Sequence, residues 1–164
     1  MVGRAERMTN QWRIVAAMAA ATVIAVIFFG AIEKAAAPPA TIRILLNRHA
    51  FDLEMADTPA LQARGLGGRN ALASDAGMIF LFPEARPRVF WMKDMRIPID
   101  IIWLRGGVVL GIEAQIPPPE SGTADDALVR YPSPGPVDTV IELAAGRAAA
   151  IGLIPGQRVD IPLR

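Results

Sequence analysis

A single carboxylate inside an apolar stretch is the first candidate for chemistry in this sequence. Asp100 lies within Ile97–Leu104, where it is the only charged residue. Burying a carboxylate is costly unless a cation or several hydrogen-bond donors meet it. The cations nearby in the chain are Arg69, Lys93 and Arg96, so we expect a partner for Asp100 among them. A fixed carboxylate, ion-paired or bonded to backbone, is favoured over a working acid or base.

A second group of residues has the types found around small-ligand sites. Trp91, Lys93 and Asp94 set an aromatic ring beside charged groups, a common way to hold a sugar or another small polar ligand. Strand alternation places Trp91 and Lys93 on one face and Phe90 on the other. Tyr131, in a later loop, would complete the cleft, and Trp91 as a simple packing residue is the alternative interpretation.

Other catalytic chemistries lack the residues they need. The chain has no cysteine and one histidine, His49, in a predicted surface turn. We therefore expect no metal, no cofactor and no thiol or Ser-His-Asp nucleophile. The glycines at 65, 67 and 68 follow no strand and precede no lysine-bearing helix, so they are turn residues rather than a phosphate loop.

The charge pattern also narrows the partners. The formal net charge is +1, and the basic excess lies within the first 13 residues. The near-neutral remainder makes nucleic acid an improbable partner, because nucleic-acid binding needs a basic patch. Without cysteine there is no disulfide, so packing must stabilise the fold.

An uncharged apolar segment, residues 14–32, has the length of a transmembrane helix. Three arginines and one glutamate precede it, which predicts a cytoplasmic tip at residues 1–13 and export of everything that follows. Residues 33–40 then form a Pro/Ala linker, and 41–164 one domain. A cleaved signal is the alternative, but the segment is long and Pro38 follows the small residues 35–37, so a retained anchor is favoured.

Alternation of apolar and polar residues in the domain predicts a mostly β, α+β fold. Two short helices are expected at 59–64 and 147–151, and the prolines and glycines of 117–126 and 131–136 predict surface loops. Gly106-Gly107 predicts a tight hairpin turn. The expected strands, which we predict to form a compact barrel-like domain, are 42–46, 51–55, 77–82, 89–93, 97–104, 108–112, 137–143 and 157–161.

Four sequence blocks carry a family resemblance. They are Gly65-Leu66 with Arg69, Gly77-Met78-Ile79-Phe80, Phe90-Trp91-Met92-Lys93 and Ile97-Pro98-Ile99-Asp100-Ile101-Ile102. In this order, across residues 42–161, the chain resembles the DUF192 (UPF0127) family of uncharacterised bacterial proteins. The resemblance implies a compact, mostly β domain behind a signal or anchor, without an assigned activity. The chain departs from the family pattern at Gly67, where methionine is usual, and at Met95, where a threonine-like residue is usual.

Three classes of function remain open on the sequence. The first is a binding or accessory module of the cell envelope, anchored once in the bacterial inner membrane with a periplasmic domain, that takes a small polar ligand or an envelope protein. The second is a hydrolase of an envelope polymer that uses Asp100 with Asp94 or Glu113. The third is a purely structural envelope protein. We favour the first, with Arg69, Trp91, Lys93, Asp94, Asp100 and Tyr131 as candidate ligand-binding residues, and name no catalytic residue.

Overall fold

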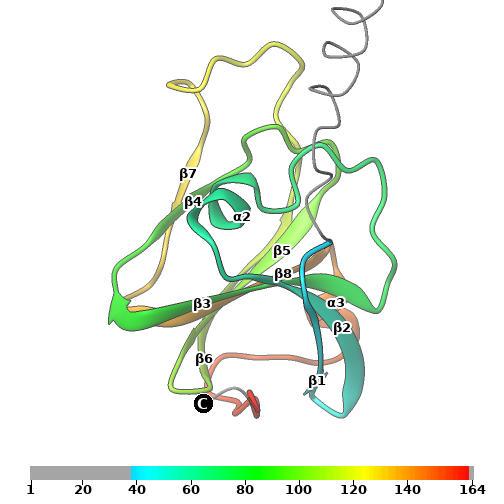
Figure 1. Cartoon of the computed structure of the whole chain (residues 1–164), viewed down its shortest axis with the longest axis vertical. Helices are drawn as coiled ribbons and strands as arrows, with labels where there is room; N and C mark the ends of the chain where they lie inside the picture. The colour runs from blue at the N-terminus through cyan, green and yellow to red at the C-terminus, as the bar shows by residue number, and fades with distance from the viewer. Residues whose placement is uncertain (1–37, 163–164) are drawn as a thin grey trace, which may run out of the picture. The chain divides into compact units, whose positions relative to one another are not determined.

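A six-stranded sheet organises residues 38–162, the part of the chain that this computed structural model describes (Figure 1). The strand order is β1-β2-β3-β8-β5-β6. All neighbours are antiparallel except β2 and β3, which are parallel and joined by a crossover that contains helix α2. The strands of this sheet are β1 (Thr41–Leu46), β2 (His49–Ala56), β3 (Ala76–Arg86), β5 (Ile99–Arg105), β6 (Val108–Ile116) and β8 (Val137–Ala144).

Helix α2 (Pro59–Arg64) begins and ends where the sequence predicts. The Thr58 hydroxyl accepts a hydrogen bond from the Leu61 N–H, and Pro59 occupies the first turn, where no intrahelical donor is needed. Gly65 ends the helix with a φ of 53°, a backbone conformation that favours glycine. The helix therefore has a fixed end, from which the chain passes directly into Leu66.

Each face of the sheet carries its own apolar cluster. Phe51, Ile102 and Ile141 belong to one cluster, against which helix α3 (Arg147–Ala150) packs through Ala148. Met78, Phe80 and Trp103 belong to the other cluster, on the α2 side. Successive residues in a strand point to opposite faces, which predicts two separately filled cores in a sheet whose central strands are apolar on both faces at most positions.

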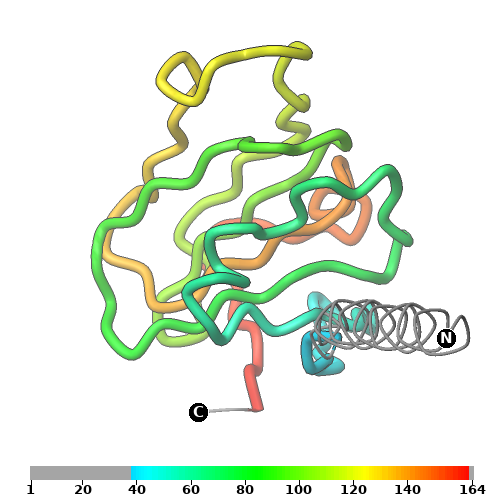
Figure 2. The backbone as a smooth tube through the Cα atoms, turned by 45° about the horizontal axis from the view of Figure 1, so that its top comes forward, coloured from blue at the N-terminus to red at the C-terminus, as the bar shows by residue number. Residues whose placement is uncertain are grey.

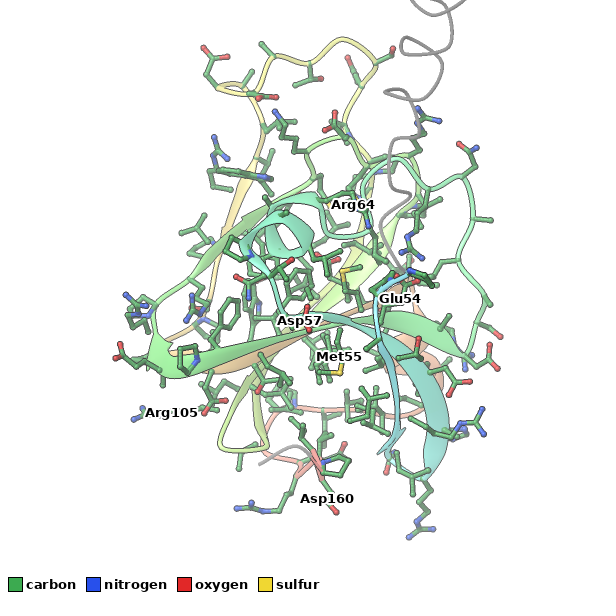
Figure 3. All side chains as sticks on the ribbon, in the orientation of Figure 1. Glu54, Met55, Asp57, Arg64, Arg105 and Asp160 are labelled. Atoms are coloured by element: carbon green, nitrogen blue, oxygen red, sulfur yellow. The ribbon has the colours of Figure 1, made fainter. Side chains whose placement is uncertain are left out.

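Along β2, the same alternation places a charged side chain and an apolar side chain on opposite faces of the sheet. Met55 packs against the α3-side cluster, whereas Glu54 pairs with Arg69. Figure 3 shows the two side chains on opposite sides of the sheet.

A second sheet of two antiparallel strands, β4 (Val89–Trp91) and β7 (Arg130–Pro132), lies over the α2-side cluster. Phe90 attaches it to the main sheet by edge-to-face contacts with Phe80 and Trp103, at centroid distances of 5.0 and 5.3 Å. Figure 2 shows residues 117–129 as a long loop leading into β7 and away from the main sheet. Aromatic packing thus sets the position of β4, the strand that contains Trp91.

The barrel-like prediction is wrong, because the main sheet is open, with β1 and β6 at its edges. The expected strand at 157–161 is also absent. Only Arg158 forms a bridge, to Val108, and the positive φ values of Gly152 and Gly156 put turns directly before this stretch, which pairs with β6 too briefly to form a strand. This segment still covers one end of β6, since the Val109 N–H donates to Gln157 and the Val159 N–H donates to Gly107.

Two further expectations need correction. The predicted strand 89–93 ends at Trp91 and belongs to the small sheet, and the predicted loop 131–136 begins with β7. Within residues 38–162 no helix is long and apolar enough to cross a membrane. The predicted anchor, residues 14–32, lies outside the described residues.

Candidate functional site

Backbone donors surround Asp100. Its side chain is fully buried, and Oδ1 accepts hydrogen bonds from the N–H groups of Gln115 (2.7 Å) and Gly146 (2.9 Å). Oδ2 accepts from the N–H of Ala148 at 2.9 Å. Two of these donors belong to the start of α3, so Asp100 fastens that helix to β5. Of the two interpretations of Asp100, the geometry supports the fixed, backbone-bonded carboxylate, and no ion pair of the described residues includes it.

Asp100 also faces away from the other candidate residues. It lies opposite Leu143 in the β5–β8 register, and Leu143 belongs to the α3-side cluster. The neighbouring pair, Ile101 and Glu142, points to the opposite face. The predicted acid–base partnership of Asp100 with Asp94 or Glu113 therefore has no support, because Asp100 faces the α3 side of the sheet. The carboxylate that lines a cavity is Glu142, on the α2 side.

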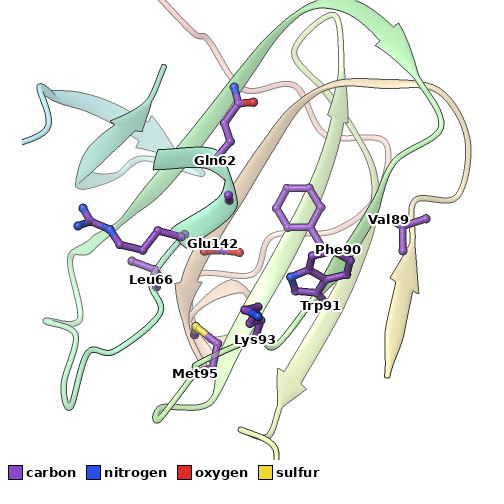
Figure 4. A pocket seen from close by; sticks show the side chains of 11 residues that line it. Gln62, Leu66, Val89, Phe90, Trp91, Lys93, Met95 and Glu142 are labelled. Carbon is purple, nitrogen blue, oxygen red and sulfur yellow. The ribbon is translucent and has the colours of Figure 1, made fainter. Parts of the chain in front are cut away.

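The candidate site is a cavity of about 120 Å³ between α2 and β4, called here the Glu142 cavity (Figure 4). Figure 4 shows the Glu142 carboxylate between Leu66 on one side and Phe90 and Trp91 on the other. The cavity is lined by Gln62, Ala63, Arg64, Gly65, Leu66, Val89, Phe90, Trp91, Lys93, Met95 and Glu142.

Glu142 is the unusual residue of this cavity. Only 5% of it is exposed, and its Oε2 has no hydrogen-bond partner among the described residues. Burial raises the pKa of Glu142 from 4.5 to about 7, although a hydrogen bond from the Leu66 N–H and the charge of Arg69 both act to lower it. A buried acceptor without a donor is rare in folded proteins and calls for an explanation.

Trp91 and Lys93 form the outer rim, and each is held by the segment around β7. Trp91 is 46% exposed, and the Arg130 guanidinium lies 4.0 Å from its ring centroid, across the β4–β7 register. Lys93 forms an ion pair with Asp125, which raises the pKa of Lys93 through their hydrogen bond. The long loop is thereby connected to the cavity rim.

The remaining candidates lie around the cavity rather than in it. Arg69 pairs with Glu54 through two hydrogen bonds of 2.6 Å, an arrangement that ties the segment after α2 to β2. Tyr131 is half-buried, opposite Phe90 in the small sheet, and packs on the α2-side cluster. Asp94 is exposed and lines a neighbouring groove of about 760 Å³ beneath the loop 117–129.

The structure thus places Trp91 and Lys93 at one cavity and adds Glu142, which the sequence analysis missed; that these residues bind a ligand stays a prediction. The signal for Glu142 was available. It is a carboxylate in a predicted strand, 137–143, although Asp138 and Thr139 make this stretch more polar than the one around Asp100. Alternation alone could not tell which of the two carboxylates lies against backbone donors and which lies in a cavity.

The fold and cavity define a small, mostly β domain with one buried carboxylate facing a pocket. A family model, DUF192, described as an uncharacterised ACR, matches residues 42–161, and the chain belongs to this family. A comparison with curated proteins found no match.

Two solved structures are similar to this chain. One, from Sinorhizobium meliloti 1021, is provisionally described as a transcription regulator; it is 30% identical, with a TM-score of 0.63, over 73% of this chain and 91% of that one. The other is a protein of unknown function from Novosphingobium aromaticivorans DSM 12444; it is 33% identical, with a TM-score of 0.65, over 78% of this chain and 95% of that one.

Proposed function

We propose that this protein is a binding module that holds a small polar group in the Glu142 cavity. The observation that carries the proposal is the buried Oε2 of Glu142, which has no donor among the described residues. A ligand that donates a hydrogen bond would satisfy this oxygen, because the cost of leaving a buried acceptor unpaired is then removed. The ring of Trp91 would cover the ligand from the rim.

The charges around the cavity favour a neutral donor over a cation. Lys93 and Arg69 already pair with Asp125 and Glu54. The charge of Arg69 still acts on Glu142, and burial raises the pKa of Glu142 to about 7, so a large fraction of this carboxyl group is neutral at neutral pH. A hydroxyl or carboxamide group suits such a site better than an ammonium group does.

A hydrolase that uses two carboxylates has less support. Such an enzyme needs two carboxyl groups that flank one bond across an open cleft. Glu142 is the single carboxylate among the residues that line the cavity, and Asp100 lies on the other face of the sheet. A purely structural role leaves the unpaired oxygen of Glu142 without an explanation.

We further propose that residues 14–32 tether the binding domain to the bacterial inner membrane, so that the domain works in the periplasm. The apolar length of this segment and the arginines before it support the placement.

A thermal-shift screen of the full-length protein tests the binding proposal. Envelope sugars, small amides and short peptides would be added to the wild type and to Glu142→Gln, Trp91→Ala and Lys93→Ala. Binding to the folded state raises the melting temperature by mass action. We expect one class to stabilise the wild type and to lose its effect in Glu142→Gln and Trp91→Ala. Asp126→Asn, on the exposed loop, is the control. Equal shifts in the wild type and Glu142→Gln would contradict the site.

A further inference from the structure

The edge of β4 that faces α2 carries backbone groups that have no partner within residues 38–162. The Ser133 N–H donates to the Arg88 carbonyl at 2.8 Å, and the Arg88 N–H donates to the Ser133 hydroxyl at 2.9 Å, so Arg88 and Ser133 face each other as a hydrogen-bonded pair at the start of the β4–β7 ladder. In an antiparallel ladder such pairs alternate with pairs whose N–H and C=O groups point outward. The next residue, Val89, is therefore outward, and so is Trp91.

Two further observations agree with this register. Val89 lies opposite Pro132, which has no N–H to contribute to a ladder, as a non-bonded position allows. In the described part of the chain, no backbone hydrogen bond beyond the strand ladders involves Val89 or Trp91. β4 lies between β7 and α2 (Figure 1), so these groups point toward α2.

The space between α2 and β4 continues beyond the Glu142 cavity. A second hollow of about 390 Å³ shares Gln62, Ala63, Val89 and Phe90 with that cavity. We call the two hollows together the α2–β4 groove. Arg88 lines its far end, with its guanidinium 3.3 Å from the ring centroid of Phe82.

The groove contains an unpaired donor as well as an unpaired acceptor. Nε of Arg88 is buried and has no hydrogen-bond partner among the described residues, as is the case for Oε2 of Glu142. Val89 and Trp91, whose N–H and C=O groups point outward, line the same groove. The groove thus presents hydrogen-bond donors and acceptors along the edge of β4.

We propose that the α2–β4 groove binds an extended peptide, which adds a strand to β4 and places one side chain with a neutral hydrogen-bond donor in the Glu142 cavity. This inference rests on the proposed function and identifies the class of ligand that the Glu142 cavity binds, which is a peptide. A peptide backbone offers alternating N–H and C=O groups at the spacing of a strand edge, and its alternate side chains reach a pocket below. A threonine hydroxyl or a glutamine carboxamide supplies the donor for Oε2.

The first experiment uses a fluorescein-labelled heptapeptide of alternating threonine and valine and two N-methylated isomers of it. One isomer is methylated on every threonine nitrogen, the other on every valine nitrogen. Because the threonine side chains must face Glu142, only one of the two sets of N–H groups can face β4. Fluorescence anisotropy with the full-length protein should show that one isomer binds like the parent and that the other binds at least about tenfold more weakly, the effect of losing a hydrogen bond.

The second experiment changes the protein. Val89→Pro removes the outward N–H of residue 89 but no ladder hydrogen bond, and Val89→Ala is the matched control that shortens the same side chain. Val89→Pro should bind the parent peptide about tenfold more weakly than Val89→Ala does, because both variants lose the valine side chain but only the proline variant loses the N–H. Thermal melting verifies that both variants are folded.

The outcomes separate this inference from the proposed function. If both isomers bind equally, or both lose binding, or Val89→Pro binds like Val89→Ala, strand addition is wrong. If the parent peptide does not bind while a small amide or sugar still stabilises the wild type but not Glu142→Gln, the peptide class is wrong and the small-ligand site stands. If neither binds, both proposals fail.

Discussion

Asp100 and Glu142 lie on adjacent strands in neighbouring register positions and have opposite surroundings. Asp100 accepts three backbone hydrogen bonds, whereas one oxygen of Glu142 accepts none from the described residues. Because strand alternation puts them on opposite faces, one carboxylate fastens α3 and the other faces a cavity. The same residue type therefore has a structural role in one position and is available to a ligand in the other.

Asp100→Ala should destabilise the domain by an amount on the order of 3 kcal/mol, since it leaves one buried and two partly buried N–H donors without their acceptor. Urea unfolding of the full-length protein measures the effect. Asp126→Ala, in the exposed loop, should change the free energy of unfolding by less than about 0.5 kcal/mol. An unfolding midpoint for Asp100→Ala that equals that of the wild type would show that the three hydrogen bonds contribute nothing.

Glu142 should make stability depend on pH. Its pKa is about 7 in the folded protein against 4.5 ordinarily, so the unfolded chain releases this proton first as the pH rises. The contribution of Glu142 to stability is therefore greatest below pH 4.5 and is lost as the pH rises through about 7, by an amount on the order of 3 kcal/mol.

Glu142→Gln cannot ionise and should lack this loss. Relative to the wild type, the variant should gain stability between pH 5 and pH 8 in urea unfolding experiments. Glu120→Gln, which changes an exposed carboxylate, should follow the wild type. Parallel pH curves for the wild type and Glu142→Gln would mean that Glu142 ionises as freely in the folded protein as in the unfolded chain.

At the scale of elements, local patterns predicted most of the architecture. The β5–β6 hairpin turns at Gly106 and Gly107, both with positive φ, as the glycine pair indicates. Helix α2 follows from Thr58 and Pro59. The open sheet, the small β4–β7 sheet and the parallel β2–β3 pair depend on contacts between distant segments, which alternation within one strand does not specify. The Glu142 cavity lies between α2 and β4, so sequence could identify its rim but not its interior.

Gly77 allows three strands to pack closely at the centre of the sheet. A Cβ at this position would lie 2.4 Å from the Glu142 carbonyl oxygen and 2.8 Å from a methyl group of Leu53 and of Leu143. Gly77→Ala should therefore cost at least the roughly 1–3 kcal/mol typical of overpacking, because backbone must move. Thermal or urea unfolding measures the loss.

Gly135→Ala is the matched control, because a Cβ there has no neighbour within 4 Å and the residue needs no positive φ. It should unfold within about 0.5 kcal/mol of the wild type. If Gly77→Ala unfolds like Gly135→Ala, the packing of β3 against β8 is looser than the structure shows.

At the scale of the whole molecule, the proposed topology places the domain in the periplasm. Alkaline phosphatase, which is active only outside the bacterial cytoplasm, fused after Arg164 should be active and should sediment with membranes. Deleting residues 14–32 should abolish that activity, since export would stop. Activity that persists without this segment, or an inactive fusion in the intact chain, would contradict the anchor.

The most direct test of the account is the ionisation of Glu142 in the full-length protein, followed by carbon-13 NMR of its carboxyl group and assigned with Glu142→Gln. The account predicts a titration midpoint of about 7 in the free protein. It also predicts a change in the Glu142 carboxyl signal on addition of a ligand from the thermal-shift screen, because Oε2 then gains a donor. A midpoint near 4.5 and a signal that the ligand leaves unchanged would contradict the claim that a buried, ligand-facing carboxylate defines the site.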